Sequence, residues 1–385
     1  MNDGPARRSP RSGLDLDRRD LFRLGAGAAA AVALSSCAYT RSLDYSAAAA
    51  TGPAAKAKID GDLVYFNWAD YLDPTVVAGF KKEYGVKIIE SNFDSMEGMD
   101  AKLQAGNQYD IIFPGAKWVE RLRQQGRLQR IDHDQLKNAH QVFGTGGYFD
   151  NPWYDPQSKY SVPFTVYKTG MAWRTDKVDT MTGSWADLWN PKAAGKIYTL
   201  DNQDEALGMA ALRLGMDVNT ADSNNLDRVV SLLKSQKPLL RAYSSDDIGN
   251  LASGNAWIHH MWSGDFLYFL LNQATDPSKF KFQVAKEGVP INSDAYAIPA
   301  NAKHPGTALL FIDYLLRPEN AVKNIQYLCY PMPVKDAEGA FAALAKDAPE
   351  CNVSLADLAS PTVFKNLPNV EVQARSAAWT NVKAS

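Results

Sequence analysis

Short β-prone segments alternate with helical segments through the first part of this chain. An apolar run at residues 63–66 is followed by Asp73 and Pro74. These are a typical helix N-cap and first-turn proline, and with Gly85 as the stop they predict a helix over residues 74–84. The alternation continues with strands at 86–89 and 109–113 and helices at 96–105 and 118–125. This βαβαβα order predicts an α/β fold in which helices cover a mostly parallel sheet.

A second alternating region follows an irregular stretch at residues 132–160 that is rich in Gly, Pro and aromatic residues. Residues 160–173 resume an extended pattern and predict a crossover into a second lobe. The elements expected there are strand 196–200, helices 204–214 and 226–235, strand 239–243, a helix from Asp246, strand 256–262 and helix 266–272. A strand at 296–299 and a long helical stretch at 305–328 are expected to return to the first lobe.

Length and composition narrow the class of protein. The 385 residues suffice for two domains with sizeable cores, and 45 % apolar and 22 % charged residues are typical of a soluble globular protein. A net charge of −2 gives no basis for binding nucleic acid. Three cysteines are too few for a disulfide scaffold or a structural zinc site. The sequence leaves open whether Cys329 and Cys351 join in a disulfide.

The N-terminus carries the pattern of an export signal. The basic segment RRDLFR at residues 18–23 precedes a small-residue apolar run at 24–34, which is too short to span a membrane as a mature helix. Paired arginines before an apolar residue indicate twin-arginine export. The segment LSSC at 34–37 resembles a bacterial lipobox, in which Cys37 would be lipidated. Residues 1–36 are therefore predicted to be a signal peptide and 37–60 a lipid anchor and flexible tether.

The loop after the first strand combines two aromatic rings with one acid. Trp68, Asp70 and Tyr71 lie at the carboxyl end of strand 63–66, where open α/β sheets bind their ligands. An aromatic face and a carboxylate are what a small organic cation needs. The alternative is that Trp68 and Tyr71 are core aromatics and that Asp70 only helps the helix to begin.

Similar combinations recur at other strand ends, at residues 202–205, 262–265, 292–294 and 330–331. Each one alone is compatible with a helix cap or a surface acid. Together, four carboxylates and three aromatics at loop positions of two lobes predict a cleft for a cation.

Catalysis and metal binding have little support in the sequence. Ser263-Gly264 follows Trp262 and does not match the nucleophile elbow of hydrolases. His259 and His260 are adjacent and would face opposite sides of a strand, so they cannot form one metal-binding face. The glycine-rich segment 144–147 lacks the lysine and following helix of a phosphate-binding loop. We therefore expect no enzyme activity, no catalytic residues, no cofactor and no metal.

Six segments resemble the periplasmic polyamine-binding proteins of ABC importers, the spermidine and putrescine receptors. They are YFNWADY at 65–71, YDIIFP at 109–114, SWADLW at 184–189, AIPANAK at 297–303, LLRPE at 315–319 and YP at 330–331. The resemblance covers nearly all of residues 61–335 and is loose in the last fifty. It implies two α/β lobes joined by a hinge, with a ligand cleft between them. Lobe 1 would comprise residues 61–167 and 294–330, and lobe 2 residues 168–293 and 331–385.

The resemblance also implies which residues hold the ligand. Trp68 and Tyr71 would flank the methylene chain of a polyamine, and Asp70 would pair with one ammonium group. The other implied contacts are a hydrogen bond from Glu205, stacking on Trp262, an acid at Asp265 as in putrescine-selective members, a terminal-amine site at Asp294 and closure by Tyr330. Charge-assisted acceptors at both ends and apolar walls between them suit a diamine. The implied partners are a small cationic ligand and an ABC permease, with the receptor itself a monomer.

Four positions bear on specificity because they depart from the family pattern. Gly115 and Lys117 stand where the family has a serine and a nearby tyrosine, Asn202 where spermidine binders carry an aspartate, and Asn292 where an aromatic is usual. The retained residues favour a putrescine-like diamine over spermidine. The alternative is another amine-bearing solute, such as an opine or an amino-acid conjugate, with Lys117 contacting its carboxylate.

Overall fold

The computed structural model describes residues 54–144, 146–359 and 361–385, which belong to one of the two compact units of the chain. Cys37, the signal sequence and most of the predicted tether lie outside the described residues. The end of the predicted tether, from residue 54, contacts the fold: Ala57 N–H donates to Gln135 at 3.4 Å, and Asp60 accepts from Thr307 N–H at 2.9 Å.

The described residues form one nine-stranded sheet in the order β2-β1-β3-β9-β4-β7-β5-β6, with β8 also paired to β4. The strands are β1 (Leu63–Trp68), β2 (Ile88–Phe93), β3 (Ile111–Ile112), β4 (Ser161–Arg174), β5 (Ile197–Thr199), β6 (Leu240–Tyr243), β7 (Ile258–Trp262), β8 (Phe280–Gln283) and β9 (Ile291–Ala297). Pairing is parallel among β1, β2 and β3 and among β5, β6 and β7, whereas β4 and β9 pair antiparallel. The predicted α/β class is confirmed.

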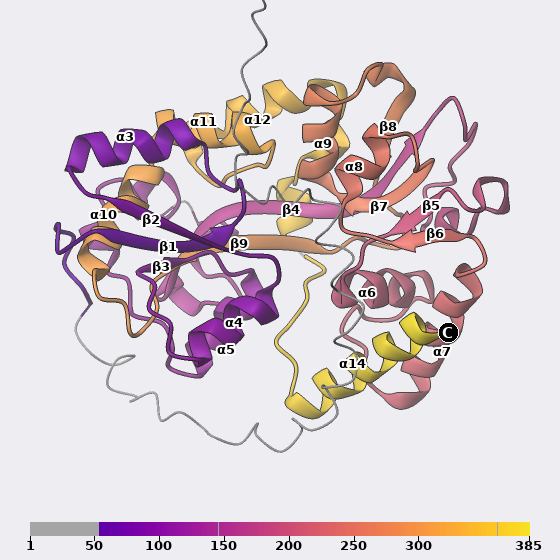
Figure 1. Cartoon of the computed structure of the whole chain (residues 1–385), viewed down its shortest axis with the longest axis horizontal. Coiled ribbons are helices and arrows are strands. Elements are labelled where there is room, and N and C mark those ends of the chain that lie inside the picture. The colour runs from indigo at the N-terminus through magenta and orange to yellow at the C-terminus, as the bar shows by residue number, and fades with distance from the viewer. Residues whose placement is uncertain (1–53, 145, 360) are drawn as a thin grey trace, which may run out of the picture. The chain divides into compact units, whose positions relative to one another are not determined.

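Helices cover both faces of the sheet. They are α3 (Pro74–Tyr84), α4 (Met96–Gln104), α5 (Ala116–Gln124), α6 (Gln203–Arg213), α7 (Ser223–Gln236), α8 (Asp247–Ala252), α9 (Ser263–Asn272), α10 (Pro305–Leu315), α11 (Pro318–Leu328), α12 (Glu338–Leu344), α13 (Leu355–Ala359) and α14 (Asn369–Ala384). Figure 1 shows α3 and α11 on the opposite face from α4 and α5 beside β1–β3, and α9 on the opposite face from α6 beside β5–β7. Within the described residues no helix combines the length and apolar character needed to cross a bilayer.

The long strand β4 connects the two parallel groups of strands. Its first half, from Ser161 to Lys168, pairs with β9, and its second half pairs with β7 and β8. Figure 1 shows β4 and β9 running between the β1–β3 group and the β5–β7 group. The lobe boundaries expected at 167/168 and 293/294 therefore fall inside these two strands.

Local signals account for most helix ends. Asp73 caps α3 by accepting from Thr75 N–H at 2.7 Å, Pro74 is its first residue, and Gly85 ends it in the left-handed conformation with φ of 67°. The predicted helical stretch over 305–328 consists of two helices, because α10 ends at Leu315 and α11 begins at Pro318. Arg317 is extended with ψ of 131°, as the residue before a proline prefers.

The last strand also differs from expectation. The prediction placed it at 296–299 and left Asp294 in the preceding loop, but β9 spans Ile291–Ala297 and Asp294 lies within it. The strand was predicted too short because it was located from apolar runs, and residues 292–294 of β9 are polar. Cys329 and Cys351 are both buried as free thiols.

Candidate functional site

Asp294 is a buried carboxylate surrounded by hydroxyl groups. Its side chain accepts a hydrogen bond from the Tyr71 hydroxyl at 2.8 Å and longer ones from Tyr167 at 3.4 Å and Thr165 at 3.5 Å. Only 4 % of Asp294 is exposed, and this burial raises the pKa of its carboxyl to about 6, although the three hydroxyls act in the opposite direction. Gly115 pairs with Asp294 as an isolated antiparallel β-bridge, and a Cβ atom at Gly115 would lie 3.4 Å from Asp294 Oδ1.

Glu205 is a second buried carboxylate, in the first turn of α6. It accepts from the Thr169 hydroxyl at 2.8 Å, from the Asn292 amide at 2.8 Å and from the Trp262 indole N–H at 3.3 Å. Burial raises the pKa of Glu205 to about 7. Asn202 is the N-cap of α6 and accepts from the Glu205 backbone N–H at 3.2 Å, so it positions this carboxylate.

Asp265 is a third, half-buried carboxylate, in the first turn of α9. The hydroxyl of Tyr330 donates to it at 2.7 Å, and desolvation raises the pKa of Asp265 to about 6. Gly264 makes this contact possible, because a Cβ atom at that position would overlap the ring of Tyr330. The Tyr330 ring in turn packs edge-on against Tyr167 and Tyr71, with centroids 5.2 and 6.1 Å apart.

The three carboxylates surround Tyr167. Its hydroxyl donates to Asp294, its register partner Asn292 donates to Glu205, and its ring packs on that of Tyr330, which donates to Asp265. After desolvation, the charges of Asp294, Glu205 and Asp265 are the largest causes that raise the pKa of Tyr167 well above its usual value. Among the described residues, no lysine, arginine or histidine forms an ion pair with any of these three acids. A site with three carboxyl groups and no positively charged partner in the described part of the chain is suited to a cationic ligand. The positive charge of that ligand would offset the free-energy cost of burying the acids.

Two predicted residues lie apart from this cluster. Trp68 packs edge-on against Phe93 with centroids 4.6 Å apart, and Asp70 is exposed in the left-handed conformation with φ of 55°. Neither makes a side-chain hydrogen bond to Asp294, Glu205 or Asp265 in the described structure. Of the loop at 67–71, Tyr71 alone reaches the acids.

Lys117 forms an ion pair with Asp204 and with none of the three acids. Arg375 of α14 lies 3.5 Å from the same carboxylate. Burial would raise the pKa of Asp204, but the charges of Lys117 and Arg375 hold it below its usual value. Lys117, the basic residue predicted to lie near the ligand, is therefore paired with an acid of the protein.

Three hydroxyl residues of β4 belong to the site but were not predicted from the sequence. Thr165 and Tyr167 donate to Asp294 and Thr169 donates to Glu205, from one face of the strand at alternate positions. The sequence did contain a signal for them, because hydroxyl residues at alternate positions of the predicted extended segment 160–173 would share one face of a strand. Their partners depend on the antiparallel register that sets Thr165 opposite Asp294 and Tyr167 opposite Asn292.

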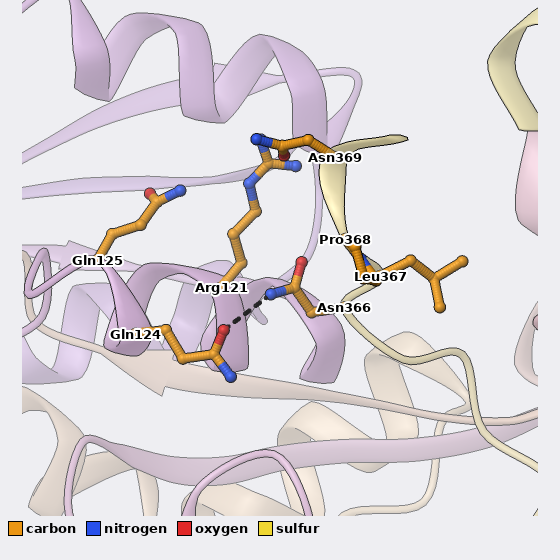
Figure 2. Close-up of a pocket in the computed structure, with 7 residues that line it drawn as sticks. All are labelled: Arg121, Gln124, Gln125, Asn366, Leu367, Pro368 and Asn369. Carbon is orange, nitrogen blue, oxygen red and sulfur yellow. Dashed lines mark hydrogen bonds between the residues drawn. The ribbon is translucent and has the colours of Figure 1, made fainter. Parts of the chain in front are cut away.

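A separate pocket of about 350 Å³ lies between α5 and the segment before α14. Figure 2 shows its lining residues, with Asn366 donating to the side chain of Gln124 at 3.0 Å. None of the predicted site residues lines it. No group of three or more His, Cys, Asp or Glu side chains in the described part of the chain is placed to hold a metal ion.

Known structures and families agree with this architecture. The solved structure of a putative spermidine/putrescine ABC transporter protein from Listeria monocytogenes superposes with a TM-score of 0.77 at 25 % identity, covering 84 % of this chain and 99 % of that one. Fold and site together define a two-lobe α/β solute-binding protein of the kind that serves ABC transporters. A family model described as bacterial extracellular solute-binding protein matches residues 75–350. The chain belongs to this family.

Two relatives with polyamine-binding names are similar in sequence to this chain. The spermidine/putrescine-binding periplasmic protein of Salmonella typhimurium is 34 % identical over 300 residues, which are 77 % of this chain and 84 % of that protein. The putrescine-binding periplasmic protein PotF of Escherichia coli is 28 % identical over 344 residues, covering 83 % and 90 %. The resemblance inferred from the sequence is confirmed, and these relatives are transport receptors rather than enzymes.

Proposed function

We propose that this protein captures a polyamine for an ABC importer and that it favours a putrescine-like diamine over spermidine. The observation that carries the proposal is the arrangement of Asp294, Glu205 and Asp265 around Tyr167 without a protein cation among the described residues. Relatives whose names specify spermidine, putrescine or both support the ligand class. A ligand with two ammonium groups would supply a positive charge for two of these carboxylates at neutral pH.

The ligand would lie with one ammonium group at Asp294 and the other at Asp265. The Tyr71 and Tyr330 rings would pack beside its methylene carbons, with Trp262 as the opposing wall and Glu205 as an additional acceptor. Trp68, the last residue of β1, and Asp70, which is exposed, would be secondary contacts of the ligand. Asn292 would tune Glu205 through its 2.8 Å hydrogen bond and would contribute no aromatic wall of its own.

Capture would proceed by closure of two lobes. We assign lobe 1 to residues 61–167 and 294–330 and lobe 2 to 168–293 and 331–385, so that β4 and β9 form the hinge. Asp294 and Tyr71 would belong to lobe 1 and Glu205, Trp262 and Asp265 to lobe 2. A ligand that contacts both groups favours the closed state by its differential affinity, and the closed receptor, as a monomer, would dock on its permease.

Export and anchoring follow from the N-terminal sequence. We propose a twin-arginine signal over residues 1–36 and lipidation at Cys37, which would hold the receptor on the outer face of the cytoplasmic membrane. Membrane fractionation of cells that express the full chain tests this assignment. Cys37→Ala should move the protein from the membrane to the soluble fraction, and an unchanged distribution would contradict lipidation.

A thermal-shift screen tests the ligand class. The panel is putrescine, cadaverine, spermidine, spermine, 1-aminobutane and amino-acid amines, because binding to the folded state must raise the melting temperature. Putrescine should give the largest shift and the monoamine a small one, since it leaves one acid unpaired. No shift with any diamine, or a larger shift with a compound that carries a carboxylate, would contradict the proposal.

A further inference from the structure

A short segment before the last helix joins the two proposed lobes outside the acidic cluster. We call residues 362–368 the C-terminal strap. It begins beside β9, where the backbone N–H of Ile291 donates to the carbonyl of Thr362 at 2.8 Å, and it leads into α14 at Asn369. In Figure 1 it descends from the sheet on the side that carries α5, α6 and α14. The C-terminal strap therefore runs between elements of both lobes.

The C-terminal strap is fixed to lobe 2 by packing. Phe364 is only 8 % exposed, and a Cβ atom at Gly208 of α6 would lie 2.7 Å from its ring, so the ring lies directly on that helix. Asn219 holds the backbone on both sides of the ring, because it donates to the carbonyl of Val363 at 2.9 Å and accepts from the N–H of Lys365 at 2.9 Å. Exposing a buried aromatic ring and its paired backbone groups would be costly. The C-terminal strap is therefore expected to move with lobe 2.

The contact of the C-terminal strap with lobe 1 is polar. Asn366 donates from its backbone N–H to Glu120 of α5 at 3.2 Å and from its side-chain amide to Gln124 at 3.0 Å. The pocket of about 350 Å³ that Arg121 and Asn366 line lies in this contact, between α5 and the strap (Figure 2). Hydrogen bonds beside such a gap can break at small net cost, because water replaces the lost partner. This contact can therefore open while the packing on lobe 2 stays intact.

A second contact between α5 and lobe 2 uses the same face of the helix. Lys117, Glu120 and Gln124 follow one another at spacings of three and four residues, so they lie along one side of α5. Lys117 pairs with one carboxyl oxygen of Asp204 in α6, and Arg375 of α14 lies 3.5 Å from the other oxygen. One face of α5 thus bonds to both α6 and the C-terminal strap.

We propose that the C-terminal strap is a latch, which together with Asp204 binds the polar face of α5 and holds a fraction of the ligand-free receptor closed. The inference rests on the proposed lobes and their closure. A ligand held by both lobes favours the closed form, so its apparent Kd depends on how much of the free protein is already closed. Loss of the latch therefore weakens the binding of different diamines by one common factor, because the latch residues are not among the proposed ligand contacts.

The first test needs no ligand. The double variant Glu120→Ala, Gln124→Ala removes both α5 acceptors of the strap, and alanine preserves the helix. Spin labels at Asn107→Cys and Asp227→Cys, exposed positions of lobe 1 and lobe 2, report the distance between the lobes by pulsed electron paramagnetic resonance. A Cys37→Ala background leaves two other thiols, which are buried. The double variant should lose the short-distance population that ligand-free wild type shows, and identical distance distributions would overturn the inference.

The second test measures affinity. Calorimetry should give Kd values for putrescine and cadaverine that are each weaker by about three- to tenfold in the double variant, with an unchanged ratio between the two ligands. The control variant Glu319→Ala, Gln326→Ala removes the same two types of side chain from exposed positions of α11 and should bind as wild type does. A loss of less than about twofold, or a changed ratio, would overturn the inference. If the wild type binds neither diamine, the proposed function fails and the label distances alone decide whether the latch exists.

Discussion

Lys117 forms an ion pair with Asp204, the residue that immediately precedes Glu205 in the first turn of α6. The pair joins α5, which packs on β9, to α6, which packs on α7 and α14. The one basic residue that seemed placed to oppose a cationic ligand is therefore neutralised by an acid outside the cluster. Among the described residues, Asp294, Glu205 and Asp265 therefore have no positively charged partner, and a cationic ligand could pair with them.

Replacing Lys117 by methionine should change the Kd for putrescine by no more than about fivefold. Both partners of the pair are about a quarter exposed, at 27 % and 22 %, and such partly exposed pairs contribute about 0–1 kcal/mol. Titration calorimetry measures the effect, with Lys323→Met on the exposed face of α11 as the matched control. A loss of about fiftyfold or more, with Lys323→Met unaffected, would instead indicate that Lys117 holds a carboxylate of the ligand.

Tyr71→Phe should weaken diamine binding by about tenfold. The change removes the 2.8 Å hydrogen bond to Asp294 and keeps the ring, and a hydrogen bond to a charged group is worth about 1.5–3 kcal/mol. Tyr243→Phe is the control, since the Tyr243 hydroxyl is buried without a partner. Equal affinity of Tyr71→Phe and wild type would show that the Tyr71 hydroxyl does not support binding through Asp294.

Substitutions of Trp262 separate its ring from its indole N–H. Trp262→Ala should abolish most binding, because it removes both an apolar wall and a donor to Glu205. Trp262→Phe retains a ring and should keep an intermediate affinity. If fluorescence or calorimetric titration finds wild-type affinity in Trp262→Ala, the ligand does not contact this side chain.

The raised pKa values of the acids predict opposite effects of pH on binding and on stability. The pKa values of about 6 for Asp294 and Asp265 and about 7 for Glu205 mean that these groups take up protons between pH 8 and pH 5, so the affinity for a diamine should fall over that range. The ligand-free protein should behave in the reverse sense. A carboxyl whose folded-state pKa is raised stabilises the fold below its unfolded pKa and loses that contribution as the pH rises through the folded pKa.

Thermal unfolding with and without putrescine at pH 5 and pH 8 checks both effects. The melting temperature without ligand should be lower at pH 8, and the increase caused by putrescine should be larger there. An increase in melting temperature that is the same at both pH values would show that these acids do not titrate on binding.

Much of the fold was predictable because its signals are local. The alternation of apolar and helical segments located most strands and helices, and Asp73, Pro74 and Gly85 marked the ends of α3. The break at Arg317 was also visible as a residue before proline, although the apolar pattern continued through it. The polar strand β9 was harder, because its site-facing residues interrupt the apolar run.

The site was predictable only as a set of acids at strand ends. Which donors serve them depends on register between distant segments: Tyr71 and Asp294 are 223 positions apart, and Thr169 and Glu205 are 36 apart. The partner of Lys117, 87 positions away, depends on how α5 and α6 approach each other.

We propose that Asp294 holds one ammonium group of a diamine, and this role can be measured directly. Titration calorimetry with putrescine at pH 7.5 should give wild-type affinity near micromolar, about 8 kcal/mol, and Asp294→Asn should weaken it by about a hundredfold or more, since one ammonium would be left buried without its counter-charge. Asp134→Asn, at an exposed acid, controls for net charge, and thermal unfolding shows that each variant is folded. Wild-type affinity in a folded Asp294→Asn would contradict the account.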